Sequence, residues 1–237
     1  MLAPTTDTPV RQDGVMPELQ RQFTVTLERV LSGVATLATE NSPDWLKRPG
    51  EAEMGALWPL AQRVYSELTE FELPRVAPLR ERRRVDVVLS YASGERRIVE
   101  FDERQHFTEA RLRTLEFYDH LAPVAFEVGQ WRERCEQLRG REAGGGFAAP
   151  KPPLFPGPGG RHRQRAFRDF LADALPSVHG WLPTVRFQDV ETKKPLSSGD
   201  ADSAIVELWS TKTGEVMASR DRLDSLADIE ARVRLGE

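Results

Sequence analysis

The sequence predicts an α/β protein whose helices cover a mixed β-sheet. Apolar residues recur at helical spacing over residues 17–39 and 52–70, which is typical of amphipathic helices. Residues 85–102 alternate with a period of two around a Ser93-Gly94 corner, as the strands of a hairpin do. The order helix, strand, strand, strand, helix and strand indicates an α/β sandwich with a mixed sheet.

The segments before the hairpin are predicted to be two helices and an edge strand. Pro17 suits the first turn of the first helix, and Pro59 either bends the second helix or begins it. Residues 71–79 are predicted as a short strand, and their two prolines favour the edge of the sheet.

The segments after the hairpin are predicted to complete the sandwich. Thr108 is the expected cap of a helix that runs to about residue 118. Residues 123–128 are apolar enough to be a central strand, and residues 131–139 are expected to form another helix.

A Pro- and Gly-rich stretch, residues 141–160, predicts a linker between two regions. We expect a flexible arm over residues 1–15, a main domain over residues 16–140 and a small C-terminal α+β region over residues 161–237. The elements expected in the last region are a helix, two strands and a final helix, at residues 161–175, 184–190, 205–209 and 223–235.

The composition predicts a soluble, cytoplasmic protein without a membrane partner. The chain is 39% hydrophobic and 30% charged, and it shows no secretory signal and no apolar run long enough to span a bilayer. Its single cysteine, Cys135, excludes an internal disulfide framework. A net charge of −4 argues against a globally basic nucleic-acid binder but leaves room for local basic patches.

Three acidic residues of the hairpin are predicted to lie close together. Glu100 and Asp102 share one face of the second strand, and the hairpin brings Asp86 toward them. Buried carboxylates must be neutralised, and two explanations are open. One is a hard divalent cation, Mg²⁺ or Mn²⁺, held by carboxylate and carbonyl oxygens. The other is ion pairing with neighbouring arginines, namely Arg82, Arg83, Arg84, Arg96 and Arg97.

The segment I-V-E-F-D-E-R-Q-H-F, residues 98–107, resembles the E-x-D-x-x-Q-H signature of small bacterial proteins related to the very-short-patch repair endonucleases. These are similar to the PD-(D/E)XK phosphodiesterases, the restriction-endonuclease-like superfamily. The resemblance implies that superfamily's αβββαβ core over residues 52–139. It also implies a metal-dependent endonuclease that acts on DNA, or on RNA.

The resemblance implies roles for individual residues. Asp86 and Glu100 would bind the metal, joined by the backbone carbonyl of Phe101 and by Asp102. Gln105 and His106 would orient water or move a proton. The resemblance also implies Glu67, on the preceding helix, as an outer acid. Nucleic-acid phosphates are expected to contact five arginines, namely Arg84, Arg97, Arg161, Arg163 and Arg165.

Each of these residues also has an ordinary structural interpretation. His106 is equally suited to cap or pack a helix start, Glu67 to face solvent, and the arginines of residues 161–165 to form a solvated helix face. The five tryptophans are interpreted as packing residues, because no interleaving of aromatic and basic residues is evident: Trp45, Trp58, Trp131, Trp181 and Trp209.

One departure from the superfamily pattern leaves three functions open. Asp102 stands where the superfamily has lysine, and no lysine occurs between Lys47 and Lys151. The chain is therefore an active lysine-free nuclease, an inactive nuclease-like fold that binds nucleic acid or a protein partner, or a structural or regulatory protein whose acids are all salt-bridged. The sequence does not predict the oligomeric state.

Overall fold

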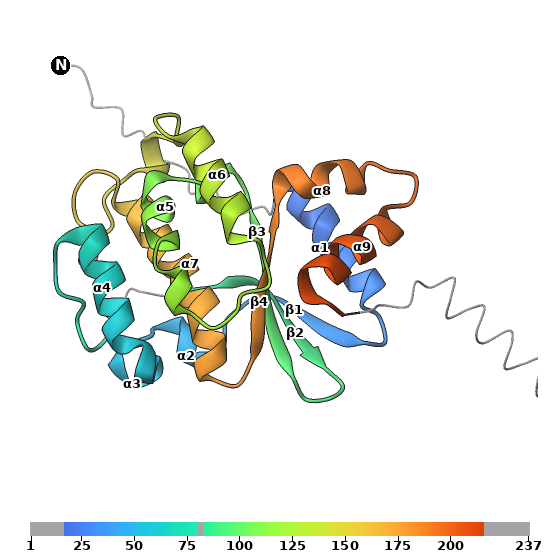
Figure 1. Ribbon diagram of the computed structural model, residues 1–237, viewed down its shortest axis with the longest axis horizontal. Helices are drawn as coiled ribbons and strands as arrows, with labels where there is room; N and C mark the ends of the chain where they lie inside the picture. Colours follow the sequence, from blue (N-terminus) through green and yellow to red (C-terminus); the bar gives the residue numbers. More distant parts are fainter. Residues whose placement is uncertain (1–16, 80–82, 216–237) are drawn as a thin grey trace, which may run out of the picture.

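The computed structural model describes residues 17–79 and 83–215 of the chain. Figure 1 shows a central sheet between two layers of helices. Its strands, in chain order, are β1 (Ala35–Asn41), β2 (Val85–Tyr91), β3 (Arg96–Asp102) and β4 (Leu182–Gln188). The order in the sheet is β1-β2-β3-β4; β1–β2 and β2–β3 pair antiparallel and β3–β4 pairs parallel. The predicted α/β class with a mixed sheet is confirmed.

The helices divide between the two faces of this sheet (Figure 1). One face carries α1 (Glu18–Val30), α8 (Asp189–Leu196) and α9 (Ala201–Thr213). The other carries α2 (Asp44–Lys47), α3 (Glu51–Met54), α4 (Trp58–Thr69), α5 (Glu109–Leu115), α6 (Val128–Leu138) and α7 (Gly160–Val178). Short 3₁₀ turns lie at Gly55–Leu57, Arg104–His106, Tyr118–His120 and Gly145–Phe147.

Each face of the sheet has its own hydrophobic core. Val88 and Ile98 pack with α4 to α7, whereas Val87 and Val99 pack with α1 and α9. The alternation of the hairpin therefore places consecutive residues of β2 and β3 in different cores. None of the described helices is long and apolar enough to cross a lipid bilayer.

The predicted hairpin and two helix starts are confirmed. Gly94 has φ +90°, a conformation that glycine adopts without a steric penalty, and it turns β2 into β3. The hydroxyl of Thr108 accepts a hydrogen bond from the backbone N–H of Arg111 and caps α5. Pro59 lies in the first turn of α4 and so begins that helix rather than bending it.

The predicted helix over residues 17–39 is too long. It ends at Val30, and Gly33 follows with φ +81°. Ala35–Asn41 then forms the edge strand β1, because its backbone pairs with β2 from Ala35–Tyr91 to Asn41–Val85. The apolar residues of β1 continue the helical spacing of α1, so the sequence predicted a helix, whereas pairing with β2 makes this segment a strand.

Three predicted strands are wrong. Residues 71–79, with two prolines, form bends and coil, and β1 holds the expected edge position. Residues 123–128 contribute a single bridge, between Ala125 and Val185, because β4 occupies the place beside β3. Residues 205–209 belong to α9, which begins with Asp200 accepting a hydrogen bond from the backbone N–H of Ser203.

The Pro/Gly-rich stretch over residues 141–160 packs against the main domain. Leu154 and Phe155 are buried in the same core as α4, and the hydroxyl of Tyr65 donates to the carbonyl of Leu154 at 2.6 Å. The described parts of residues 16–140 and 161–237 share the sheet, since β4 pairs with β3. The expected arm over residues 1–15 and the final helix over residues 223–235 lie outside the described residues.

Candidate functional site

The acids of the hairpin lie on the sheet face that α7 covers. Glu100 and Asp102 alternate along β3 with Val99 and Phe101, whose side chains belong to the opposite core. This arrangement confirms the predicted alternation of the strand. Glu100 is 4% exposed and Asp102 is fully buried. Both carboxylates must therefore be stabilised by partners inside the protein.

Asp86 and Glu100 lie together where the β2–β3 ladder ends. The carboxylate of Asp86 accepts a hydrogen bond from the backbone N–H of Phe101 at 2.7 Å. The backbone N–H of Asp86 lies 3.4 Å from Oε2 of Glu100. Burial, followed by the negative charge of Glu100, raises the pKa of Asp86 to about 8. Asp86 is therefore mainly protonated at neutral pH.

A guanidinium already contacts one member of this pair. Arg83 is buried and lies in a salt bridge with Glu100 at 2.5 Å. The same Nη2 lies 3.9 Å from the carboxylate of Asp169, which projects from α7. Among the described arginines that the sequence suggested, Arg83 is thus the one that pairs with Glu100.

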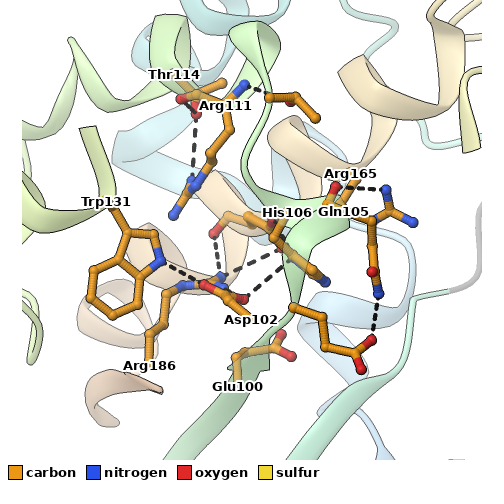
Figure 2. Close-up of polar contacts among 12 residues, drawn as sticks. Glu100, Asp102, Gln105, His106, Arg111, Thr114, Trp131, Arg165 and Arg186 are labelled. Carbon is orange, nitrogen blue, oxygen red and sulfur yellow. Dashed lines mark hydrogen bonds and ion pairs between the residues drawn. The ribbon is translucent and has the colours of Figure 1, made fainter. Parts of the chain in front are cut away.

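Asp102 is bound on both of its oxygens (Figure 2). Arg186 of β4 donates to Oδ1 at 2.8 Å, and the indole N–H of Trp131 donates to Oδ2 at 2.7 Å. Nδ1 of His106 lies 3.3 Å from Oδ1. This carboxylate is therefore engaged with protein partners and not paired with Asp86 and Glu100.

His106 forms a hydrogen-bonded pair with Asp169. Nδ1 of His106 lies 3.0 Å from Oδ2 of Asp169, and the imidazole remains 19% exposed. Burial disfavours the charged imidazole, but Asp169 and Asp102 outweigh it and raise the pKa of His106. Burial would raise the pKa of Asp169, but His106 and Arg186 hold it well below its usual range. The geometry thus leaves Nε2 of His106 as the ring nitrogen available to a substrate.

A second buried acid on α7 extends the network. Asp173 accepts from Nε of Arg186 at 2.7 Å and from Arg111 at 3.0 Å, and it also accepts from the hydroxyl of Tyr118. Arg186 therefore bridges Asp102 and Asp173, which joins β3 and β4 to α7. These shared hydrogen bonds fix the orientation of the acids that they join.

Sequence reasoning missed Asp169, Asp173 and Arg186. The available signal was a charged residue inside an apolar run: R-D-F-L-A-D-A places the two acids one turn apart on α7, and V-R-F places Arg186 within β4. An ionisable residue in such a run requires a buried partner.

The other predicted residues lie in separate places. Gln105 donates to Glu103 at 2.7 Å, and its carbonyl accepts from Arg165 at 2.9 Å. Glu67 lines a groove of about 620 Å³ with Glu109, Arg113 and Arg163 and does not join the hairpin acids.

The predicted phosphate contacts differ in their availability. Arg84 is exposed and pairs with Glu40, whereas Arg97 is 4% exposed and pairs with Glu215. Arg163 donates to the carbonyls of Pro156 and Pro158. Arg161 and Arg165 are half-buried on α7, and Arg165 influences the pKa of His106. Arg165 is therefore the predicted phosphate-binding arginine whose charge acts on the imidazole.

The described side chains contain no cluster of three or more His, Cys, Asp and Glu residues arranged to hold a metal ion. The carboxylates of Asp86 and Glu100 nevertheless supply oxygen donors of the kind that Mg²⁺ and Mn²⁺ prefer. Of the groups that the motif implies as metal ligands, Asp102 has both oxygens engaged by Arg186 and Trp131, which leaves Asp86, Glu100 and the carbonyl of Phe101.

A scan against protein-family models found no match to this chain, and searches of curated proteins and of solved structures found none either.

Proposed function

We propose that this chain is a metal-dependent phosphodiesterase of the restriction-endonuclease-like class that acts on DNA. One observation carries the proposal: the acids Asp86 and Glu100 come from adjacent strands and lie together, and burial and the charge of Glu100 raise the pKa of Asp86 to about 8. A carboxyl group whose pKa is raised by desolvation and by a neighbouring acid is typical of functional sites.

The topology supports the proposal. A helix (α1), three antiparallel strands (β1 to β3), helices and a fourth strand parallel to β3 follow one another in the chain. This is the order αβββαβ that the motif implies, although it begins at α1 rather than at residue 52. The helices α2, α3 and α4 are inserted between β1 and β2.

Asp86, Glu100 and the carbonyl of Phe101 are the groups that would hold the metal. A divalent ion bound there would polarise the scissile phosphate and lower the pKa of an attacking water. His106 is placed to accept or return a proton through Nε2, because Asp169 engages Nδ1 and fixes the ring.

Positive charge beside the imidazole favours a phosphate substrate. Arg161 and Arg165 lie on the same side of α7, and Arg165 is fixed next to His106 by its bond to the carbonyl of Gln105. Guanidinium groups bind phosphate oxygens through two parallel hydrogen bonds. Arg186 and Arg83 supply buried positive charge in the site that lacks the superfamily lysine.

The test is a cleavage assay on circular single-stranded and duplex DNA with Mg²⁺, Mn²⁺ or EDTA, with an RNA substrate alongside. We expect metal-dependent nicking that Asp86→Asn and Glu100→Gln reduce by at least about a hundredfold, which is typical for the loss of a charge-stabilising group. Asp119→Asn, which changes an exposed acid, is the control and should retain full activity. Cleavage that survives both site substitutions, or its absence with every metal, contradicts the proposal.

The second candidate is a nuclease-like fold that binds nucleic acid without cleaving it. The salt bridge between Arg83 and Glu100 favours this candidate, because Arg83 neutralises the carboxylate without a metal. Calorimetry with Mn²⁺ distinguishes the two: heat of binding that disappears in Glu100→Gln supports the enzyme. No binding of Mn²⁺, together with salt-dependent DNA binding, supports the second candidate.

A further inference from the structure

A groove on the same sheet face lies beyond the hairpin acids along β2. It has a volume of about 610 Å³, and its floor includes Ala38 of β1 with Val88 and Ser90 of β2. Asp86 lies on this face of β2 as well, and four residues of a strand span about 13 Å. The groove therefore begins within the reach of a short polymer from Asp86.

Aromatic rings form one wall of this groove, although they come from distant parts of the sequence. Trp45 and His179 stack with centroids 4.5 Å apart and planes 4° apart. Trp181 meets Trp45 edge to face at 5.2 Å. His179 is held in place because its Nε2 donates to the carbonyl of Glu53 at 2.8 Å. Trp45 and Trp181 remain partly exposed, so the structure brings together the aromatic and basic residues that the sequence order kept apart.

The same wall carries an unbalanced positive charge. The exposed guanidinium of Arg96 lies 5.7 Å from the ring centroid of Trp181. Lys47 also lines the groove, but it pairs with Asp44 at 2.7 Å. Among the described residues Arg96 has no carboxylate partner, so the lining has a net positive charge.

The groove is fixed to the acidic site through Arg83. The hydroxyl of Ser42 donates to the carbonyl of Arg83 at 2.8 Å, and the backbone N–H of Arg83 donates to the carbonyl of Lys47 at 3.1 Å. The side chain of Arg83 contacts Glu100. The segment that carries Trp45 is thus anchored to the residue that touches the proposed catalytic acids.

We propose that this groove binds an unpaired segment of a polynucleotide, with a base beside the indole rings of Trp45 and Trp181 and a phosphate on Arg96. Aromatic rings beside cationic side chains bind single strands without sequence preference, because every base has a stacking face. A paired base cannot reach the rings, since both of its faces are covered by its neighbours in the duplex. The inference rests on the proposed function for the class of ligand and names a single-stranded region as the preferred substrate.

The test measures binding of fluorescein-labelled oligothymidine to the full chain in EDTA by fluorescence anisotropy. We expect Trp181→Leu and Arg96→Ala each to weaken binding by about tenfold or more, and Trp181→Phe to recover part of the loss. Arg63→Ala is the matched control for Arg96→Ala, because Arg63 also lies over a ring, 5.6 Å from that of Phe117, but outside the groove. Thermal melting of each variant verifies that it is folded. If Trp181→Leu unfolds, the test rests on Arg96→Ala, which changes an exposed side chain.

Unchanged affinity in both Arg96→Ala and Trp181→Leu would overturn the inference, as would an equal loss of affinity for a duplex of the same length. Binding in EDTA requires no cleavage. A wild-type chain that binds through the groove but never cleaves contradicts only the proposed function. A chain that cleaves and whose binding ignores both groove substitutions contradicts only this inference.

Discussion

His106 is hydrogen-bonded through Nδ1 to Asp169, a residue 63 positions further along the chain, at 3.0 Å. The bond joins the 3₁₀ turn after β3 to α7 and orients an imidazole whose Nε2 has no hydrogen-bond partner among the described residues. The arrangement is one in which a carboxylate sets the tautomer and the charge of a histidine.

Asp169→Asn should lower the pKa of His106, because the carboxylate that outweighs burial is removed while the shape is kept. Because the pKa of His106 is higher in the folded state than in the unfolded state, protonation of His106 stabilises the fold at a pH below the unfolded pKa. This stabilisation is lost as the pH rises through the folded pKa. The measurement is the NMR titration of the His106 ring proton, with the other histidines as internal references. A titration of His106 that is identical in wild type and Asp169→Asn contradicts the assignment.

Asp86 should make the protein less stable as the pH rises. Its folded pKa of about 8 lies above the ordinary value of 3.8, so the folded state holds a proton that the unfolded state has released, and stability falls between these two values. Asp86→Asn removes this dependence and should gain stability relative to wild type between pH 5 and pH 8, measured by urea unfolding. If the two chains respond identically to pH, Asp86 is not protonated in the folded state.

Added Mn²⁺ should stabilise wild type more than Asp86→Asn.

The features that the sequence predicted correctly are those set by neighbouring residues. The period of two along residues 85–102 and the positive φ of Gly94 define the hairpin, and Thr108 defines the start of α5. Even the arginine alternative was partly correct, since Arg83 does pair with Glu100.

The features that the sequence missed depend on distant partners. Ala35–Asn41 becomes a strand only because β2 lies beside it, and Asp102 is neutralised by Arg186, 84 positions away. A local pattern therefore placed three acids on one face but did not reveal that one of them already had its own cation. The same reason explains the groove, whose rings Trp45 and Trp181 meet only in the folded chain.

Arg186→Met should destabilise the protein strongly. It leaves the carboxylates of Asp102 and Asp173 without their shared guanidinium in a site that is fully buried. Breaking a buried pair on one side costs about 3–5 kcal/mol, whereas an exposed pair contributes about 0–1 kcal/mol. The control is Arg84→Met, whose pair with Glu40 is 73% and 54% exposed. Urea unfolding of both variants checks the difference; equal losses would show that the buried network is not what holds β4 to α7.

Arg83→Met should increase the affinity of the chain for Mn²⁺. The guanidinium lies on Glu100 in a salt bridge whose partners are 7% and 6% exposed, so a divalent ion that binds Asp86 and Glu100 must displace it or share its charge. Removing the positive charge of Arg83, which repels the ion, should tighten Mn²⁺ binding by about tenfold. This is the same change in free energy as a shift of one pKa unit. Isothermal titration calorimetry measures the affinity, and Arg84→Met, one residue along the chain and directed to Glu40, is the matched control. If Arg83→Met binds Mn²⁺ more weakly than wild type, Arg83 supports the ion rather than competing with it. If neither chain binds Mn²⁺, Arg83 is the resident cation of the site, and the proposed metal-dependent reaction is contradicted.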